Sequence, residues 1–169
     1  GANRLAPLCA RAGDHEGAVG ALQVVLRISP SNITAWEALG ASYNALGRHS
    51  AALKAFERAM ELSDDAGEGC RSYAAAQSGH IHLTLGSSVE AAECYDKAMS
   101  DGIDRVAVLF GSASAHAYYA KGALRWGAPG RAATSVRLAK HAILRVIELM
   151  SDDATATVWK LAGDIHHLA

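Results

Sequence analysis

The chain has 169 residues, half of them hydrophobic but only 6% aromatic, and its formal net charge is −1. This length allows one ordinary domain or a short array of repeats. The near-neutral charge excludes a general nucleic-acid binder that depends on an overall positive charge, and no run of 18 apolar residues exists that could form a membrane-spanning helix.

The pattern of apolar and turn-forming residues predicts four helical hairpins and one unpaired helix, over residues 1–30, 33–64, 68–101, 105–150 and 154–169. In the first hairpin, Gly13 separates the two helices and Pro30 follows the second, where proline often closes such a unit. The second hairpin has the clearest pattern of the four.

This second hairpin carries a set of aromatic, small and turn-forming landmarks: Trp36, Leu39, Gly40, Tyr43, Gly47, Ala52, Phe56 and Ala59. The apolar landmarks of its first helix follow at three- and four-residue steps, so they lie on one helical face. Gly40 leaves room beside them for a second helix, and Gly47 is expected to end the first helix with a positive φ angle. Small residues of the second helix then admit the rings, and Phe56 fills the space between them. We therefore expect Trp36 and Phe56 to be buried.

The landmarks recur in register on both sides of this hairpin. Gly13 precedes Gly47 by 47 − 13 = 34 residues, and a second turn glycine follows Gly47 by 86 − 47 = 39 residues. The landmarks of the third hairpin are Gly86, Ala91, Tyr95 and Ala98. A recurrence near 34 residues is typical of tetratricopeptide repeats, whose helix–turn–helix units stack on one another. The predicted fold is therefore all-α, a right-handed superhelix of antiparallel helical hairpins.

The fourth hairpin has two longer helices, separated by the breaker GAPG at residues 127–130. The stretch TVWKLAGDIHHLA then begins another first helix, in which Trp159 and Gly163 repeat the spacing of Trp36 and Gly40. This unpaired helix and a start without methionine lead us to expect a segment of a longer solenoid.

Two parts of the sequence resemble one particular family. The run HEGAVGALQVVLRISPSNITAWEALGASYNALGRHSAALKAFERAMEL, and the long hairpin beginning near VLFGSASAHAYYAKGAL with the VWKLAGD that follows it, are similar to the large tetratricopeptide (Ski3-type) subunit of the superkiller (Ski) complex. The resemblance implies a scaffold that binds a Ski2-type RNA helicase and WD-repeat Ski8 proteins. It also implies a role in feeding messenger RNA to the cytoplasmic exosome for 3′-to-5′ decay. The expected location is therefore the cytoplasm, with the nucleus as the alternative.

The sequence motifs predict neither catalysis nor a bound metal or cofactor. His80 and His82 point to different sides of a helix, as do His166 and His167, and no Cys-x-x-Cys or His-Glu-x-x-His element completes a metal site. There is no glycine-rich nucleotide loop, and the GSASA stretch lacks the strand–turn–helix setting of a nucleophile elbow. Its small residues indicate a close crossing of helices. The three cysteines lie far apart, which indicates a reducing compartment rather than a disulfide framework.

The charges are unevenly distributed along the chain. Between Arg105 and Ile147 there is no Asp or Glu, whereas acidic residues gather in the middle of the sequence. The second long helix carries a basic stripe that includes Arg137, Lys140 and Arg145. This stripe is either a solvated or internally paired face, or a site for an acidic partner surface or an RNA backbone.

A second candidate surface lies on the first helices, which line the concave groove of a tetratricopeptide array. In the clearest hairpin the groove-facing candidates are Thr34, Glu37, Ala41 and Asn44. This set lacks the Lys/Asn/Arg cluster that holds a terminal carboxylate in chaperone-binding relatives. The leading functional hypothesis is a protein-binding scaffold, not an enzyme. The alternatives are an adaptor for short peptides, and a regulatory repeat array whose catalytic domain lies outside this segment.

Overall fold

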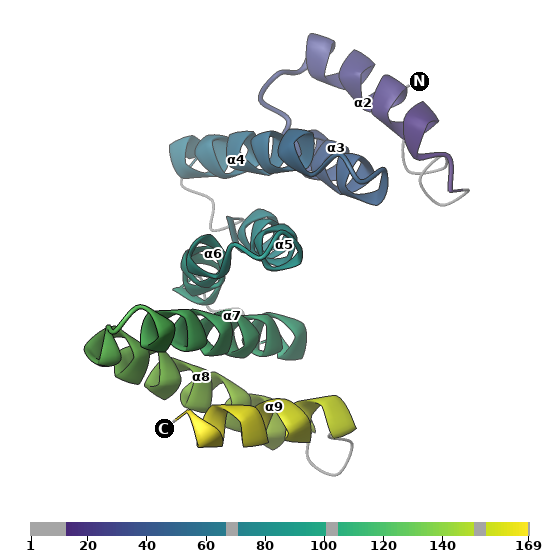
Figure 1. Ribbon diagram of the computed structural model, residues 1–169. Coiled ribbons are helices and arrows are strands. Elements are labelled where there is room, and N and C mark those ends of the chain that lie inside the picture. Colours follow the sequence, from purple (N-terminus) through teal and green to yellow (C-terminus); the bar gives the residue numbers. More distant parts are fainter. Residues whose placement is uncertain (1–12, 67–70, 101–104, 151–154, 169) are drawn as a thin grey trace. The chain divides into compact units, whose positions relative to one another are not determined.

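The computed structural model describes residues 13–66, 71–100, 105–150 and 155–168 (Figure 1). All regular structure in these ranges is α-helical, which confirms the predicted all-α class. The described helices are α2 (His15–Ile28), α3 (Ile33–Ala45), α4 (His49–Ala66), α5 (Arg71–Thr84), α6 (Ser88–Ser100), α7 (Val106–Arg125), α8 (Pro129–Met150) and α9 (Ala156–His167). The first helix of the hairpin expected over residues 1–30 lies outside the described residues.

Glycines with positive φ angles form the turns between paired helices. Gly47 has φ = 71°, Gly86 has 79° and Gly127 has 69°. At Gly47, the backbone N–H donates to the Asn44 carbonyl and the next N–H donates to the Tyr43 carbonyl, both at 2.9 Å. The other two turns repeat this pattern of backbone bonds, which is the Schellman motif. Each following helix begins two residues after its glycine, so this local motif sets the helix boundaries.

The chain divides into two compact units, Gly1–Ile81 and His82–Ala169. In the first unit, α3 packs against both α2 and α4. Its central contact is between Phe56, which is 0% exposed, and Gly40. A Cβ atom at Gly40 would lie 2.7 Å from Phe56 Cε1, so only glycine admits the ring at this distance. On another side, the Phe56 ring meets Tyr73 edge-on, with ring centroids 6.4 Å apart.

The second unit contains a contact of the same kind. A Cβ atom at Gly111 of α7 would overlap the ring of Tyr95, which projects from α6. Burial raises the pKa of Tyr95 to about 12, so its hydroxyl is neutral at physiological pH. This contact explains the glycine of the GSASA stretch as the point where α6 and α7 approach closely.

Small residues also form much of the interface between α7 and α8. Alanines of α7 meet aliphatic side chains of α8, and Val158 and Ile165 of α9 complete the cluster. Because alanine has no side-chain rotamers to restrict, it permits a close helix approach at little entropic cost. The remaining landmarks of the third hairpin, Ala91 and Ala98, are both fully buried in α6.

One repeat position was missed by the sequence analysis. Gly79 of α5 is buried and precedes Gly86 by seven residues, as Gly40 precedes Gly47. Counting back from the turn glycine identifies Gly79, because the turn fixes the register of the helix that it ends.

Trp36 and Trp159, which each precede a glycine by four residues, differ in their surroundings. Trp36 is half-buried, and its Nε1 donates a hydrogen bond of 2.8 Å to the Pro30 carbonyl. Trp159 of α9 is 56% exposed, and a Cβ at Gly163 would meet no atom within 4 Å. The expected full burial of Trp36 is thus corrected to partial burial, since one edge of its ring faces an open groove.

We expect Phe56→Ala to lower the free energy of unfolding by about 3–5 kcal/mol, because it removes a fully buried ring and leaves a cavity. Trp159→Ala is the matched control, since it truncates an exposed ring and is expected to change stability by less than about 0.5 kcal/mol. Urea unfolding followed by circular dichroism measures both values. Equal effects of the two substitutions would contradict the packing described for Phe56.

A second pair of substitutions tests the contact between ring and glycine. Gly40→Ala is expected to destabilise the chain by about 1–3 kcal/mol, because the new methyl group displaces the Phe56 ring. Gly163→Ala places the same group in open space inside a helix, where alanine is favoured over glycine by up to about 1 kcal/mol. Thermal unfolding should therefore shift in opposite directions for the two variants. A shift in the same direction would show that Gly40 does not limit the approach of the helices.

Candidate functional site

The first unit contains a groove formed by α2, α3 and α4, with a volume of about 760 Å³. We call it the α2–α4 groove and define it by its lining residues: Gln23, Leu26, Arg27, Trp36, Leu39, Tyr43, Ala51, Lys54, Ala55 and Arg58. Trp36 comes from the first turns of α3 and Tyr43 from its last turn. The groove therefore follows α3 for about 10 Å, at 1.5 Å per residue.

Two hydrogen bonds hold the aromatic side chains of the groove in place. The indole N–H of Trp36 donates to the Pro30 carbonyl at 2.8 Å, and Gln23 Nε2 donates to the Tyr43 hydroxyl at 3.2 Å. Both rings are half-buried, so part of each faces the groove. A surface fixed in this way needs little reordering when a partner binds.

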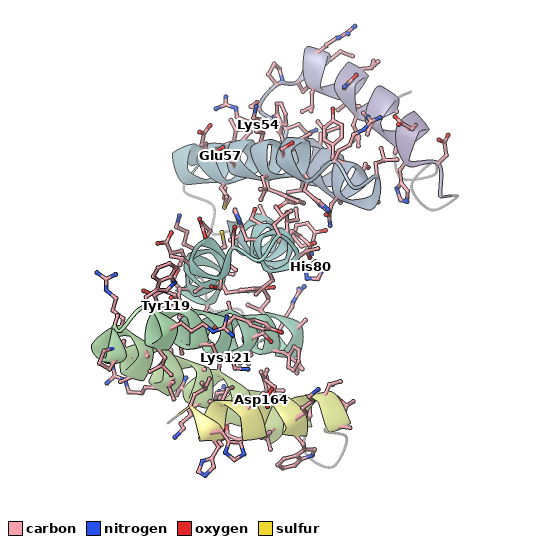
Figure 2. All side chains as sticks on the ribbon, in the orientation of Figure 1. Lys54, Glu57, His80, Tyr119, Lys121 and Asp164 are labelled. Atoms are coloured by element: carbon pink, nitrogen blue, oxygen red, sulfur yellow. The ribbon has the colours of Figure 1, made fainter. Side chains whose placement is uncertain are left out.

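The rim of the groove is basic. Arg27 of α2 and Lys54 and Arg58 of α4 line it, and no Asp or Glu is among its lining residues. Figure 2 labels Lys54 on α4. Arg58 also lies 2.8 Å from Glu61, but both side chains are about half exposed. Such an exposed pair contributes only about 0–1 kcal/mol, so it gives way readily to another carboxylate.

The basic residues of this groove are not among the sites predicted from the sequence. Their signal was a shared helical face, because Ala51, Lys54, Ala55 and Arg58 follow at steps of three, one and three residues. The spacing shows that these side chains point the same way. It does not show that α2 stands far enough away to leave a groove beside them.

The groove-facing candidates of α3 have local contacts instead. The Thr34 hydroxyl donates to Asn32 Oδ1 at 2.8 Å, and Asn44 Oδ1 lies 3.1 Å from His49 Nδ1. Glu37 is half-buried, and burial raises the pKa of its carboxyl. Burial raises the pKa of Tyr73, and the negative charge of Glu37 raises it further. This effect of Glu37 places the two side chains near each other. Ala41, the fourth candidate, packs against the Phe56 cluster. None of the four lines the α2–α4 groove.

The predicted basic stripe on α8 is divided by the structure. Arg137 and Lys140 line a second hollow of about 450 Å³, whose other lining residues include Leu124, Val136 and Leu168. Arg145 is not among those residues, and its Nη1 lies 3.3 Å from Glu148 Oε2. The stripe therefore presents two neighbouring cations beside an apolar hollow, with the third engaged by its own helix.

Within the described ranges, no three His, Cys, Asp or Glu side chains gather as metal ligands would. His116 of α7 is buried, with Nε2 3.1 Å from Asp96 Oδ1. Cys94 is a half-buried free thiol whose pKa is raised by burial, a change that lowers its fraction of reactive thiolate. The other two cysteines lie outside the described residues. No helix in the described part of the chain is long and apolar enough to cross a membrane.

The paired helices, turn glycines and small-to-large packing are those of a known repeat family. Residues 33–65 match the tetratricopeptide repeat family. They are a tetratricopeptide repeat. This stretch contains α3, most of α4 and the contact between Gly40 and Phe56. The sequence-based prediction of a tetratricopeptide repeat is thereby confirmed for residues 33–65.

Relatives extend the similarity beyond this one repeat. The chain is 32% identical over 154 residues to superkiller complex protein 3 of Homo sapiens, and 31% identical over 154 residues to tetratricopeptide repeat protein 37 of Xenopus laevis. Each alignment covers 91% of this chain and 9% of the relative. The chain thus spans about a tenth of the length of these relatives.

Solved structures support the fold. A crystal structure of the MamA protein superposes with a TM-score of 0.78 over 99% of this chain and 80% of its own, at 14% identity. The structure of YrrB, described as a TPR protein with an unusual peptide-binding site, gives a TM-score of 0.72 over 96% of this chain and 73% of its own, at 17% identity. At these identities the likeness shows the fold alone, which is that of tetratricopeptide helical hairpins.

The basic residues of α8 yield a prediction about polyanion binding. We expect the combined substitution of Arg137, Lys140 and Arg145 by Glu to lower the salt concentration at which the chain elutes from a heparin column, because fewer counterions are released on binding. The control carries the same change in charge elsewhere, at the exposed residues Lys97, Lys121 and Lys160. Elution of both variants at the same salt concentration would show that the α8 stripe is an ordinary solvated face.

Proposed function

We propose that this chain is a protein-binding scaffold segment of a superkiller-type complex, which assists 3′-to-5′ decay of messenger RNA by the cytoplasmic exosome. The observation that carries the proposal is the 32% identity to superkiller complex protein 3 over 91% of the chain. It is supported by the long α7–α8 pair followed by VWKLAGD in α9, an irregular order that a general repeat consensus does not require.

The mechanism of such a segment is binding by preformed surfaces. Each hairpin places its small and large side chains in the interface between helices, so polar and remaining apolar side chains are left on the outside. The α2–α4 groove and the basic hollow on α8 are two such surfaces, and both are lined from rigid helices. The partners of the proposed complex are a Ski2-type RNA helicase and WD-repeat Ski8 proteins, and the location is the cytoplasm. In this proposal the segment acts through its binding surfaces and not as an enzyme.

A second candidate function is that of an adaptor for short peptides. The α2–α4 groove favours it, because its volume falls within the range of about 300–1,000 Å³ that is typical of ligand sites. YrrB, which has the same fold, is described as having a peptide-binding site. Both functions use protein-binding surfaces, and they differ in whether the partners are large folded proteins or single peptides.

Affinity purification of the full-length protein that contains this segment tests the first function. We expect an RNA helicase and a WD-repeat protein to be recovered together. The control is the same protein without residues 13–168, which should lose or weaken one of the two partners if this segment contributes to their binding. Recovery of chaperones alone from the intact protein would overturn the proposal. Full retention of both partners by the shortened protein would show that the segment does not bind them.

A further inference from the structure

The α2–α4 groove combines an apolar floor with a basic rim. Its floor is formed by Leu26, Leu39 and Ala55, which are buried, and by the exposed parts of the Trp36 and Tyr43 rings. These side chains offer contact area to a large apolar group. They offer few hydrogen bonds, because the Trp36 N–H is already donated to Pro30 and the Tyr43 hydroxyl accepts from Gln23. The floor therefore selects an apolar side chain.

The basic rim determines which charge is favoured on the residues that flank that apolar side chain. Arg27 is an exposed residue near the end of α2, and Lys54 and Arg58 are exposed one turn apart on α4. Among the described residues, neither Arg27 nor Lys54 forms an ion pair. Arg58 has a partner in Glu61, on the same helix and exposed to solvent. Within the described part of the chain, two cations without an ion-pair partner and one that is weakly paired therefore border the same apolar floor.

We propose that the α2–α4 groove binds an acidic peptide segment, in which at least one large apolar side chain is flanked by Asp or Glu residues. The apolar side chain enters between α2 and α4 and packs on Trp36 and Leu39. The flanking carboxylates pair with Arg27, Lys54 and Arg58. The cations attract the segment and fix its register, and the floor supplies most of the apolar contact.

A protein segment fits this groove better than single-stranded RNA does. RNA-binding grooves combine a row of cations along the backbone with exposed aromatic faces on which bases stack. Here both aromatic rings are half-buried and held in place by hydrogen bonds, and they share the floor with three aliphatic residues. The overall charge of −1 also gives the chain no general attraction to a polyanion.

This inference deepens the proposed scaffold role, because it names the class of partner that one surface of the scaffold binds. It rests on the proposed function, since the peptide segment would belong to a partner of that scaffold. Its test uses the 169-residue chain and synthetic peptides, so it is independent of the purification described above. Failure of the peptides to bind would overturn the groove assignment and leave the partners of the full-length protein unaffected.

The experiment is fluorescence anisotropy with the labelled peptide DEFLDE, compared with DEGSDE, which lacks the apolar pair, and KKFLKK, which reverses the charge. We expect DEFLDE to bind and each of the other peptides to bind about tenfold or more weakly, since each loses one of the two kinds of contact. Binding of DEFLDE should also weaken as salt is raised from about 50 to 300 mM, because exposed charge pairs are screened. Equal binding of all three peptides, or no binding of DEFLDE, would overturn the proposal.

Substitutions locate the binding within the chain. Lys54→Gln with Arg58→Gln should weaken DEFLDE binding by about tenfold, the effect expected from removing two charge pairs. The matched control, Arg131→Gln with Lys160→Gln, makes the same change in charge at exposed residues of the second unit and should leave binding unchanged. Ala51→Phe keeps every charge but fills the groove, and should abolish binding while the circular dichroism spectrum stays that of the unsubstituted chain. Equal weakening by the control pair, or full binding by the folded Ala51→Phe variant, would place the peptide elsewhere.

A competing single-stranded RNA distinguishes the other class of partner. Unlabelled oligouridylate should fail to displace DEFLDE at concentrations where unlabelled DEFLDE does so. Displacement by the RNA that is lost in the Lys54→Gln, Arg58→Gln variant would show a nucleic-acid site in the groove and overturn the assignment to a peptide.

Discussion

The approach of an aromatic ring to a glycine sets the distance between helices in both units of this protein. In the first unit the ring of Phe56 occupies the place where a side chain at position 40 would stand, and in the second the ring of Tyr95 does so at position 111. Protein interiors are packed as densely as organic crystals, so a single methyl group at such a point forces helices or rings to move. The remaining contacts depend on this spacing, because alanine-rich helix faces reach one another only when the helices lie close together.

Because the small and large apolar side chains of each hairpin are buried between its helices, binding depends on the side chains that remain exposed. The α2–α4 groove exists because α2 and α4 both pack against α3 and leave a hollow that all three helices line. Trp36 and Tyr43 thereby have two roles. One part of each ring packs in the core, and another part lines an open surface. A repeat landmark can in this way belong to a binding surface as well as to the fold.

Net charge says little about how such surfaces select their partners. The chain has 16 basic and 17 acidic residues, yet the charged residues among the described lining of the α2–α4 groove are all basic, and Arg137 and Lys140 lie together beside the hollow on α8. The pair of Arg58 with Glu61 on α4 and the pair of Arg145 with Glu148 on α8 each neutralise charge within a single helix. They are exposed and therefore weak, so an incoming carboxylate competes with them on nearly equal terms. Charge near an apolar floor is thus the feature that distinguishes these surfaces from the rest of the exterior.

Local features of this protein follow from its sequence alone. Gly47 and Gly86 mark the turns because a positive φ angle favours glycine, and the steps of three and four residues assign Leu39 and Phe56 to buried helix faces. The resemblance to superkiller proteins was likewise available from the sequence. Only the tertiary structure decided which side chains meet across helices. It placed Tyr95 on Gly111, Glu37 near Tyr73, and Arg27 on the same groove as Lys54. The physical reason is that the period of one helix fixes the direction of a side chain, whereas its neighbour depends on the angle and distance at which a second helix packs.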